Sequence, residues 1–221
     1  MTTTLSNPPF VAIEGLDGAG PTTQTRRVAE ALTSRGQPVA KSCEPTDGPV
    51  GMIIRQMLTK RISVVDADGQ HQPVDRETLA LLFAADRLDH LNATVDPAIQ
   101  AGKVALTDRY YHSSLAYQGD IGGDDDAVDY RWVEAINERA RAPDLTVFLE
   151  ASAELCLQRL SARGRRDIYE SRQKLERLER RYDEVIERVE TRGERVLRLD
   201  ADDAVDVLTE TIVDEILSLP Q

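Results

Sequence analysis

The chain has 221 residues, and its 39 acidic and 27 basic side chains give a formal net charge of -12. This length suits one α/β domain with a full hydrophobic core, and a hydrophobic content of 41% excludes a disordered or fibrous chain. The charge argues against a broad nucleic-acid-binding surface, and no apolar run approaches the ~20 residues of a membrane-spanning helix.

Strand and helix patterns alternate along the first part of the chain. The apolar run Phe10–Glu14 predicts a strand, and a helix at about Thr22–Ser34 follows it after a glycine-rich turn. A second strand is expected at Gln37–Cys43 and a short helix at Val50–Leu58. The polar stretch Lys60–Pro73 predicts a loop.

A long helix follows, because Asp75 is a suitable N-cap for a helical pattern that runs to Leu91. We expect Pro97 to bend or end this helix. Three further apolar runs predict strands at Val104–Thr107, Leu145–Leu149 and Val196–Leu199, and the last helix is predicted at Ala204–Leu217.

Strands that are apolar along their whole length and separated by helices indicate a five-stranded parallel sheet with helices on both faces. Ligands bind at the carboxyl ends of the strands in such folds. An acidic residue ends each predicted strand, so the chemistry is expected near Glu14, Glu44, Asp108, Glu150 and Asp200.

The turn after the first strand has the spacing of a phosphate-binding P-loop. Its glycines allow successive backbone N–H groups to converge on phosphate oxygens, and a threonine hydroxyl at the start of the next helix can bind magnesium. The residues expected to bind ATP here are Gly15, Leu16, Asp17, Gly18, Ala19, Gly20, Pro21, Thr22 and Thr23, with Thr22 also a metal ligand.

One position departs from the P-loop pattern, since Pro21 stands where the pattern has a lysine. Proline suits the first turn of a helix, so the loop can still form. It nevertheless removes an ammonium group and a backbone donor from the phosphates, a loss of about 1.5–3 kcal/mol. Taken alone, this segment could therefore also be a glycine-rich turn that has lost nucleotide binding.

The rest of the chain resembles thymidylate kinase, the enzyme that moves a phosphoryl group from ATP to dTMP. The resemblance runs from Val11 to Asp200. It rests on EGLDGAG (14–20), EPTDG (44–48), LLFAADR (81–87), DRYYHSSLAYQG (108–119) and RRDIYE (165–170). The segment from 108 to 119 is highly specific to this family among nucleotide kinases. The resemblance implies a P-loop kinase fold in one domain, residues 1–221, with a lid at about 163–171.

The resemblance also assigns roles to single residues. It implies that Arg109 bridges the donor and acceptor phosphates and that Asp17 accepts from the sugar 3′-hydroxyl. Asp108 follows a predicted strand, where its carboxylate can hold magnesium through water. Thymine would stack on Phe83, with the dTMP phosphate near Arg87. Further residues expected at the dTMP site are Glu44, Arg55, Ser114, Tyr117, Gln118 and Tyr169.

An arginine cluster matches the lid that closes over ATP in this family. Members without a basic residue in the variable part of the P-loop carry an arginine in the lid, and this chain has that pattern. We hypothesise that Arg166 is catalytic and that it partly replaces the missing lysine, while Arg163 and Arg165 contact ATP. The following helix, Arg172–Arg192, has alternating charges and is interpreted as a solvated face.

The sequence therefore predicts transfer of the γ-phosphoryl group of ATP to dTMP with Mg²⁺, which gives dTDP for dTTP synthesis. Two alternatives stay open: a catalytically impaired paralogue that binds nucleotide or a partner protein, and a kinase for another nucleoside monophosphate. The resemblance implies a homodimer. The histidines form no metal or triad pattern, and we interpret His112 as an incidental polar residue.

Two features of the composition indicate a cellular setting. Cys43 and Cys156 are expected to be buried thiols of a cytoplasmic protein, and residues 1–9 carry no basic side chain of a signal peptide. Only four of the 27 basic residues are lysines, and 22 aspartates exceed 17 glutamates. An acid-rich, lysine-poor surface remains soluble at high salt, so we expect a salt-adapted cytoplasm.

We predict that the fold and the activity are both strengthened when KCl is raised, because salt screens the repulsion between surface carboxylates. Thermal unfolding and ATP-dependent turnover, each measured against KCl concentration, would test this. Full stability at low salt would contradict it.

Overall fold

The predicted five-stranded parallel sheet is confirmed in the computed structural model, which describes residues 5–120, 128–162 and 168–220. Three mostly apolar strands form its centre, because a strand that is covered on both faces buries nearly all of its side chains. The strand order is β2 (Val39–Cys43), β5 (Val104–Asp108), β1 (Phe10–Gly15), β8 (Leu145–Glu150) and β9 (Val196–Asp200).

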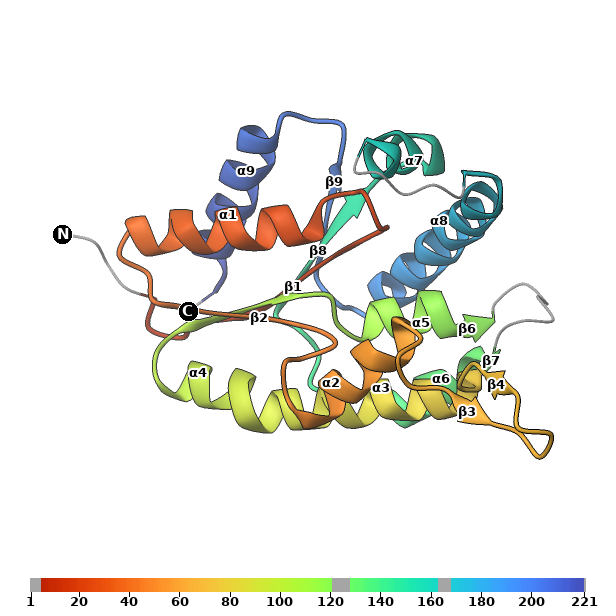
Figure 1. Cartoon of the computed structure of the whole chain (residues 1–221). Coiled ribbons are helices and arrows are strands. Elements are labelled where there is room, and N and C mark those ends of the chain that lie inside the picture. Colours follow the sequence, from red (N-terminus) through yellow and green to blue (C-terminus); the bar gives the residue numbers. More distant parts are fainter. Residues whose placement is uncertain (1–4, 121–127, 163–167, 221) are drawn as a thin grey trace.

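Helices cover both faces of this sheet (Figure 1). One face carries α1 (Pro21–Ser34) and α9 (Val205–Ser218), which pack against each other. The other carries α2 (Pro49–Leu58), α3 (Arg76–His90), α4 (Asp96–Gln100), α5 (Tyr111–Gln118) and α6 (Tyr130–Asn137). The remaining helices, α7 (Ala153–Ser161) and α8 (Ile168–Thr191), follow β8 and pack together.

The long helix begins as expected, but Pro97 does not end it. The Asp75 carboxylate accepts from the backbone N–H of Thr78 at 2.8 Å and caps α3. The chain then passes through a π-helical turn, η1 (Leu91–Val95), directly into α4, where Pro97 lies in the first turn. A proline ring clashes with the carbonyl four residues before it, and the wider π turn makes room for that ring.

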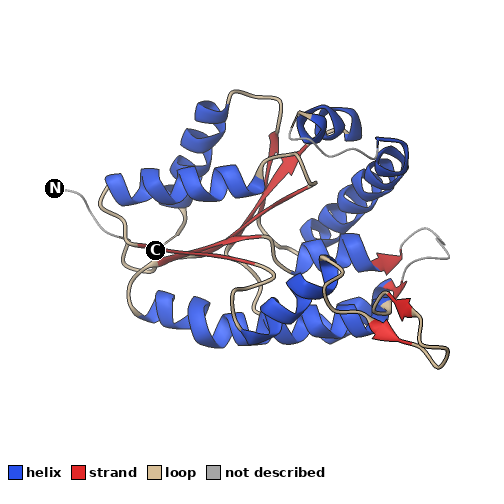
Figure 2. Cartoon of the chain, in the orientation of Figure 1, coloured by secondary structure: helices blue, strands red, loops and turns tan. Residues whose placement is uncertain are grey.

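The prediction of a loop at Lys60–Pro73 is wrong in its middle, where two short strands form a hairpin (Figure 2). They are β3 (Val64–Val65) and β4 (His71–Gln72), paired antiparallel. The Asp66 carboxylate accepts two backbone N–H groups of the connecting turn, and this turn chemistry holds the hairpin. Both residues of β3 are exposed, so no burial pattern marked them in the sequence.

A second pair of short strands, β6 (Gly119–Asp120) and β7 (Val128–Asp129), follows α5. Among the described residues, every helix is too short or too polar to cross a membrane.

The strand order places the site. From β1, the chain passes to β2 and β5 on one side of the sheet and later to β8 and β9 on the other. Such a switch point leaves a crevice at the carboxyl ends of the central strands. The glycine-rich turn after β1 lies at this crevice, beside the turns that follow β2 and β5.

Candidate active site

The loop after β1 has the backbone that phosphate binding requires. Of the nine residues of the predicted motif, Gly15 ends β1, residues 16–20 form the turn, and residues 21–23 begin α1. Gly18 and Gly20 have φ angles of 103° and 112°, which residues with a Cβ rarely adopt. Gly20 is the N-cap of α1, so the positive end of the helix dipole faces the loop. Pro21 is the first residue of α1, the position where a proline disturbs a helix least.

One ion pair joins this loop to the turn after β5. Arg109 Nη2 lies 2.8 Å from Asp17 Oδ1, and Nη1 donates to the Gly15 carbonyl at 2.9 Å. Arg109 has a φ of 72°, a left-handed conformation that persists in such a residue only when its surroundings enforce it. Burial alone would lower the pKa of its guanidinium, but the phenols of Tyr117 and Tyr182 and the Asp17 carboxylate raise it well above the ordinary value.

The carboxylate of Glu14 enforces that conformation from the end of β1. Its two oxygens accept from the backbone N–H of Tyr110 at 2.7 Å and from the Ser113 hydroxyl at 2.7 Å. The hydroxyl of Tyr182 on α8 donates to the same group at 3.1 Å. Burial would raise the pKa of Glu14, but neighbouring His112 and Arg109 lower it below its usual value. Glu14 is therefore a buried anion that fixes Tyr110 and Ser113, which follow Arg109 in the chain.

A cavity of about 780 Å³ adjoins the ion pair of Asp17 and Arg109. Most of the residues predicted to bind dTMP line it together: Asp17, Glu44, Phe83, Arg87, Arg109, Ser114, Tyr117 and Gln118. Gln118 Oε1 is buried and has no hydrogen-bond partner among the described residues. Buried polar atoms normally have a partner, so this one marks a place where a ligand can supply it.

This cavity is positively charged although the whole chain is negative. Six basic residues line it against two acidic ones. Four of the six were not predicted: Arg76, which begins α3, and Lys174, Arg177 and Arg181 on α8. The interpretation of the helix at Arg172–Arg192 as a solvated face is therefore wrong for one side of it. Lys174, Arg177 and Arg181 are spaced by three and four residues, which puts them on one side of a helix. This spacing is the sequence pattern that could have predicted a basic side of α8.

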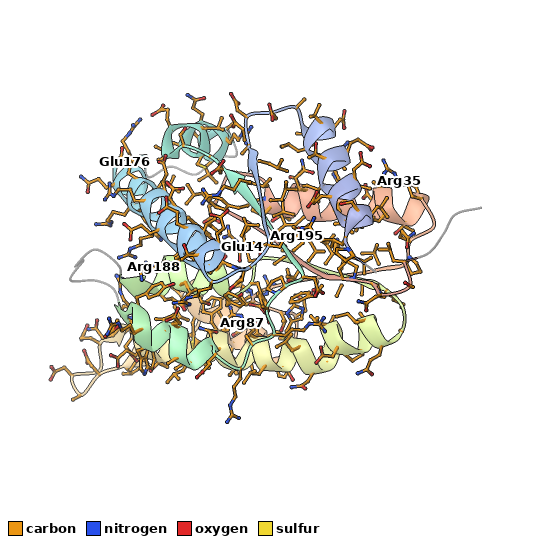
Figure 3. All side chains as sticks on the ribbon, turned by 180° about the vertical axis from the view of Figure 1, so that it is seen from behind. Glu14, Arg35, Arg87, Glu176, Arg188 and Arg195 are labelled. Atoms are coloured by element: carbon orange, nitrogen blue, oxygen red, sulfur yellow. The ribbon has the colours of Figure 1, made fainter. Side chains whose placement is uncertain are left out.

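Arg87 of α3, which is labelled in Figure 3, forms the buried, closed end of the cavity, where it contacts residues of α5 and α6. Its side chain is only 1% exposed, and Nη2 lies 2.7 Å from a carboxylate oxygen of Glu44. The same guanidinium donates to the Ser114 hydroxyl at 2.9 Å and to the side-chain oxygen of Asn137. Arg87 is thus a buried cation whose charge Glu44 already balances.

Thr22 and Asp108 lie beside the P-loop as the sequence suggested for magnesium. Asp108 Oδ1 is buried without a hydrogen-bond partner among the described residues. Burial raises the pKa of Asp108, although the hydroxyl of Thr22 and the charge of Arg109 act against this. One carboxylate and one hydroxyl, completed by water and phosphate oxygens, are the ligands that Mg²⁺ takes in kinases, so these residues fit the ion. In the described part of the chain, no cluster of three or more acidic, histidine or cysteine side chains could hold a metal by itself.

Several predicted residues lie elsewhere. Arg55 is not among the residues that line the cavity of about 780 Å³, and its guanidinium donates to the backbone carbonyls of Pro45 and Thr46. Glu150 and Asp200 line a separate acidic cavity of about 490 Å³.

The lid residues Arg163, Arg165 and Arg166 and the side chain of Tyr169 lie outside the described residues.

His112 is not the incidental polar residue that the sequence suggested. It is fully buried, with Glu194 Oε2 3.1 Å from Nε2 and Glu14 Oε1 3.7 Å from Nδ1. Sequence reasoning missed this arrangement because Glu14 and Glu194 are 180 positions apart in the chain.

Comparison with known proteins agrees with this geometry. The family model for thymidylate kinase matches residues 13–212. The chain is 38% identical over 195 residues to the putative thymidylate kinase of Aeropyrum pernix. The aligned region covers 86% of this chain and 85% of that protein. It is 39% identical to the probable thymidylate kinase of Pyrococcus horikoshii over 155 residues, 70% of this chain and 71% of that one. It is 41% identical to the thymidylate kinase of Desulfotalea psychrophila over 163 residues, 72% and 73% of the two chains. These matches, with which the glycine-rich loop and the basic cavity agree, show that the chain belongs to the thymidylate kinase family.

Proposed function

We propose that the protein transfers the γ-phosphoryl group of ATP to dTMP, giving dTDP and ADP. The observation that carries this proposal is the ion pair between Asp17 and Arg109, which joins a phosphate loop to a basic cavity. Family membership supports the same reaction and does not favour the impaired paralogue or a kinase for another nucleoside monophosphate.

The charge distribution in the cavity suggests how the acceptor nucleotide lies. Because Glu44 already neutralises Arg87, the closed end suits an uncharged base, whose carbonyl oxygen can accept from the guanidinium. Phe83 lines the same cavity and offers a ring for stacking. The acceptor phosphate then lies toward Arg109 rather than beside Arg87, where the resemblance alone had put it.

Catalysis consists of positioning and charge neutralisation. A phosphate oxygen of dTMP attacks the γ-phosphorus of ATP in line with the departing ADP, and no covalent intermediate with the protein is needed. The guanidinium of Arg109 stabilises charge on the oxygens between donor and acceptor. Asp17 holds Arg109 in place through the ion pair and can accept from the sugar hydroxyl. Magnesium, held by Thr22 and Asp108, would neutralise the ATP phosphates.

We predict that Arg109→Ala lowers kcat about 100-fold or more, because a charge that acts on the transferring phosphate is lost. The measurement is ADP release from ATP and Mg²⁺ with dTMP, beside dUMP, dCMP and dGMP. Arg180→Ala is the matched control, since Arg180 is exposed on α8 and does not line the cavity. Unchanged kcat in Arg109→Ala would exclude the proposed site, and preference for another acceptor would exclude dTMP.

The missing P-loop lysine requires a cation from elsewhere, and we assign this role to the lid arginines, with Arg166 first. Pro21 is buried at the first position of α1, where it keeps the loop but supplies no charge. Lid arginines can deliver positive charge when the lid closes over ATP.

We expect the native protein to turn over and Arg166→Ala to lose at least tenfold in kcat. Pro21→Lys should lower the KM for ATP about tenfold, as expected of one added charge-assisted contact. Steady-state kinetics of both variants at several KCl concentrations would measure these effects. A native protein that is inactive at every salt concentration but active as Pro21→Lys would instead have a disabled donor loop. Unchanged kcat in Arg166→Ala would exclude the lid hypothesis.

We also propose that two copies of the chain form a homodimer through α2 and α3. These helices pack together, and their outer side exposes Met52, Ile53, Leu81 and Leu88. Leu81 and Leu88 are seven residues apart, so they lie on the same side of α3. Large apolar side chains gathered on one exposed surface are typical of interfaces, and a second copy would remove them from water.

Leu81→Glu should convert the dimer into a monomer, because a charge would be buried without a partner at the interface. Sedimentation velocity of the native protein and the variant would measure this. Val207→Glu on α9 is the control, since Val207 is equally exposed but on the opposite face of the sheet. A native protein that sediments as a monomer would exclude the proposal.

We place the protein in a salt-adapted cytoplasm. Cys43 and Cys156 are both free thiols, which suits a reducing compartment, although Cys43 is half-buried rather than buried as expected. Arginines on α1 pair with acids on α9, as Arg35 does with Glu210 and Asp214. In this arrangement one guanidinium lies between two surface carboxylates and reduces the repulsion between them.

A further inference from the structure

His112 lies in the protein interior between two acidic side chains that come from different parts of the fold. Glu14, the penultimate residue of β1, faces the imidazole from one side, with 3.7 Å between Nδ1 and Oε1. Glu194 lies in the turn before β9 and faces it from the other side, with 3.1 Å between Nε2 and Oε2. All of His112 is buried, so solvent does not screen these charges.

The two carboxylates decide which form of His112 fits. A neutral imidazole has one N–H and one lone pair, so one ring nitrogen would turn a lone pair toward a carboxylate. The imidazolium turns an N–H group toward each acid. Nε2 lies at hydrogen-bond distance from Glu194, whereas Nδ1 has no hydrogen-bond partner among the described residues and faces Glu14 across 3.7 Å as a charge interaction. Burial would lower the pKa of His112, but Glu14 and Glu194 raise it, and the charge of His112 lowers the pKa of each acid.

Other groups around the ring are compatible with this charge. Tyr111, on the same helix, stacks on the imidazole at 4.2 Å and donates its hydroxyl to Glu194 at 2.6 Å. Thr146 of β8 brings a hydroxyl oxygen to 3.5 Å from Nε2. Both His112 and the positive charge of Arg192 lower the pKa of Glu194 and so stabilise its carboxylate as an anion.

Glu14 links this cluster to the catalytic turn. The carboxylate that faces His112 also accepts from Tyr110, which follows Arg109 directly, and from Ser113 in the first turn of α5. Ser113 Oγ accepts from Arg109 Nη1 at 3.1 Å, and Tyr182 contacts both Glu14 and Arg109. The hydroxyl groups of Ser113 and Tyr182 therefore connect Glu14 to the guanidinium of Arg109. A change in the charge balance at Glu14 is transmitted through them to the group that we propose contacts phosphate.

We infer that His112 is a positioning residue for phosphoryl transfer: as an imidazolium between Glu14 and Glu194, it fixes the carboxylate that anchors the Arg109 turn. It does not touch substrate, and it acts through Glu14. This inference rests on the proposed role of Arg109. It adds a pH dependence, since kcat should fall as pH rises far enough to remove the proton from His112.

The stability of the fold should change with pH in the same direction as kcat. A histidine whose pKa is higher in the folded than in the unfolded protein stabilises the fold fully below the unfolded pKa. That contribution is lost as pH rises through the folded value. Alkaline pH should therefore weaken both the fold and the clamp.

The test uses two variants of the whole protein. His112→Gln should lower kcat about tenfold, leave the KM for ATP near its native value and remove the alkaline decrease in the kcat profile. Glu194→Gln removes one of the two carboxylates, so the alkaline decrease should move about one pH unit lower. Glu187→Gln is the control, since it makes the same charge change on the exposed side of α8 and should leave the profile unmoved.

A separate measurement reads the charge of His112 without activity. A ¹H–¹⁵N spectrum of the imidazoles should show both nitrogens of His112 protonated at pH 7, with thermal unfolding as the check that each variant folds. If His112→Gln does not fold, Glu194→Gln and the spectrum still decide the question. A neutral His112 at pH 7, or native pH profiles in the folded variants, would overturn the inference. Loss of activity in Arg109→Ala with native behaviour of His112→Gln would reject this inference alone, whereas an active Arg109→Ala would reject the proposed site.

Discussion

The carboxylate of Glu14 holds the catalytic part of the molecule together. It lies fully buried at the end of the central strand and accepts hydrogen bonds from the turn after β5, from α5 and from α8. A buried anion is costly unless partners surround it, and three separate elements must stay in place to provide them here. The left-handed turn at Arg109 is therefore fixed by the interior of the protein. Groups that are oriented before the substrate arrives need no reorganisation during the reaction, which is the main source of electrostatic catalysis.

The placement of charge matters more than its total. A net charge of -12 would repel nucleotides, yet the acceptor cavity gathers six basic residues against two acidic ones. Elsewhere the arginines pair with acids at the surface, as Arg195 does with Glu215 and Arg198 with Glu150 and Glu190. Such exposed pairs contribute little to stability, but they leave the positive field concentrated at the cavity that we propose binds phosphate.

The sheet and the phosphate loop could be predicted from the sequence because each has a local signature, whereas most of the cavity residues were predicted from the resemblance to thymidylate kinase. Apolar strands such as Phe10–Glu14 mark a covered parallel sheet, and the spacing from Gly15 to Thr22 marks the loop. The features that sequence reasoning missed depend on contacts between distant segments. The pairing of Arg87 with Glu44 and that of His112 with Glu194 arise only when separate elements pack together.

The wrong predictions for residues 60–73 and for the helix α8 also concern features that have no clear pattern in the local sequence. The hairpin at residues 64–72 has no buried side to produce a periodic pattern, and its turn is held by one aspartate. The basic side of α8 was hidden in a helix whose charges alternate, because the pattern alone does not say which side faces the cavity. Its buried residues Leu175, Leu178 and Tyr182 lie beside the three basic positions and orient the helix.

The close approach of Gly18 to α7 limits how this phosphate loop can evolve. A Cβ at position 18 would lie 2.9 Å from the carbonyl oxygen of Cys156, so no side chain fits there without moving the backbone. Ala19 is buried, and the carboxylate of Asp17 is already engaged by Arg109. None of the three variable positions of the loop can gain a cation without loss of an existing contact. A lineage that has lost the lysine from such a loop therefore has to recruit positive charge from another part of the chain.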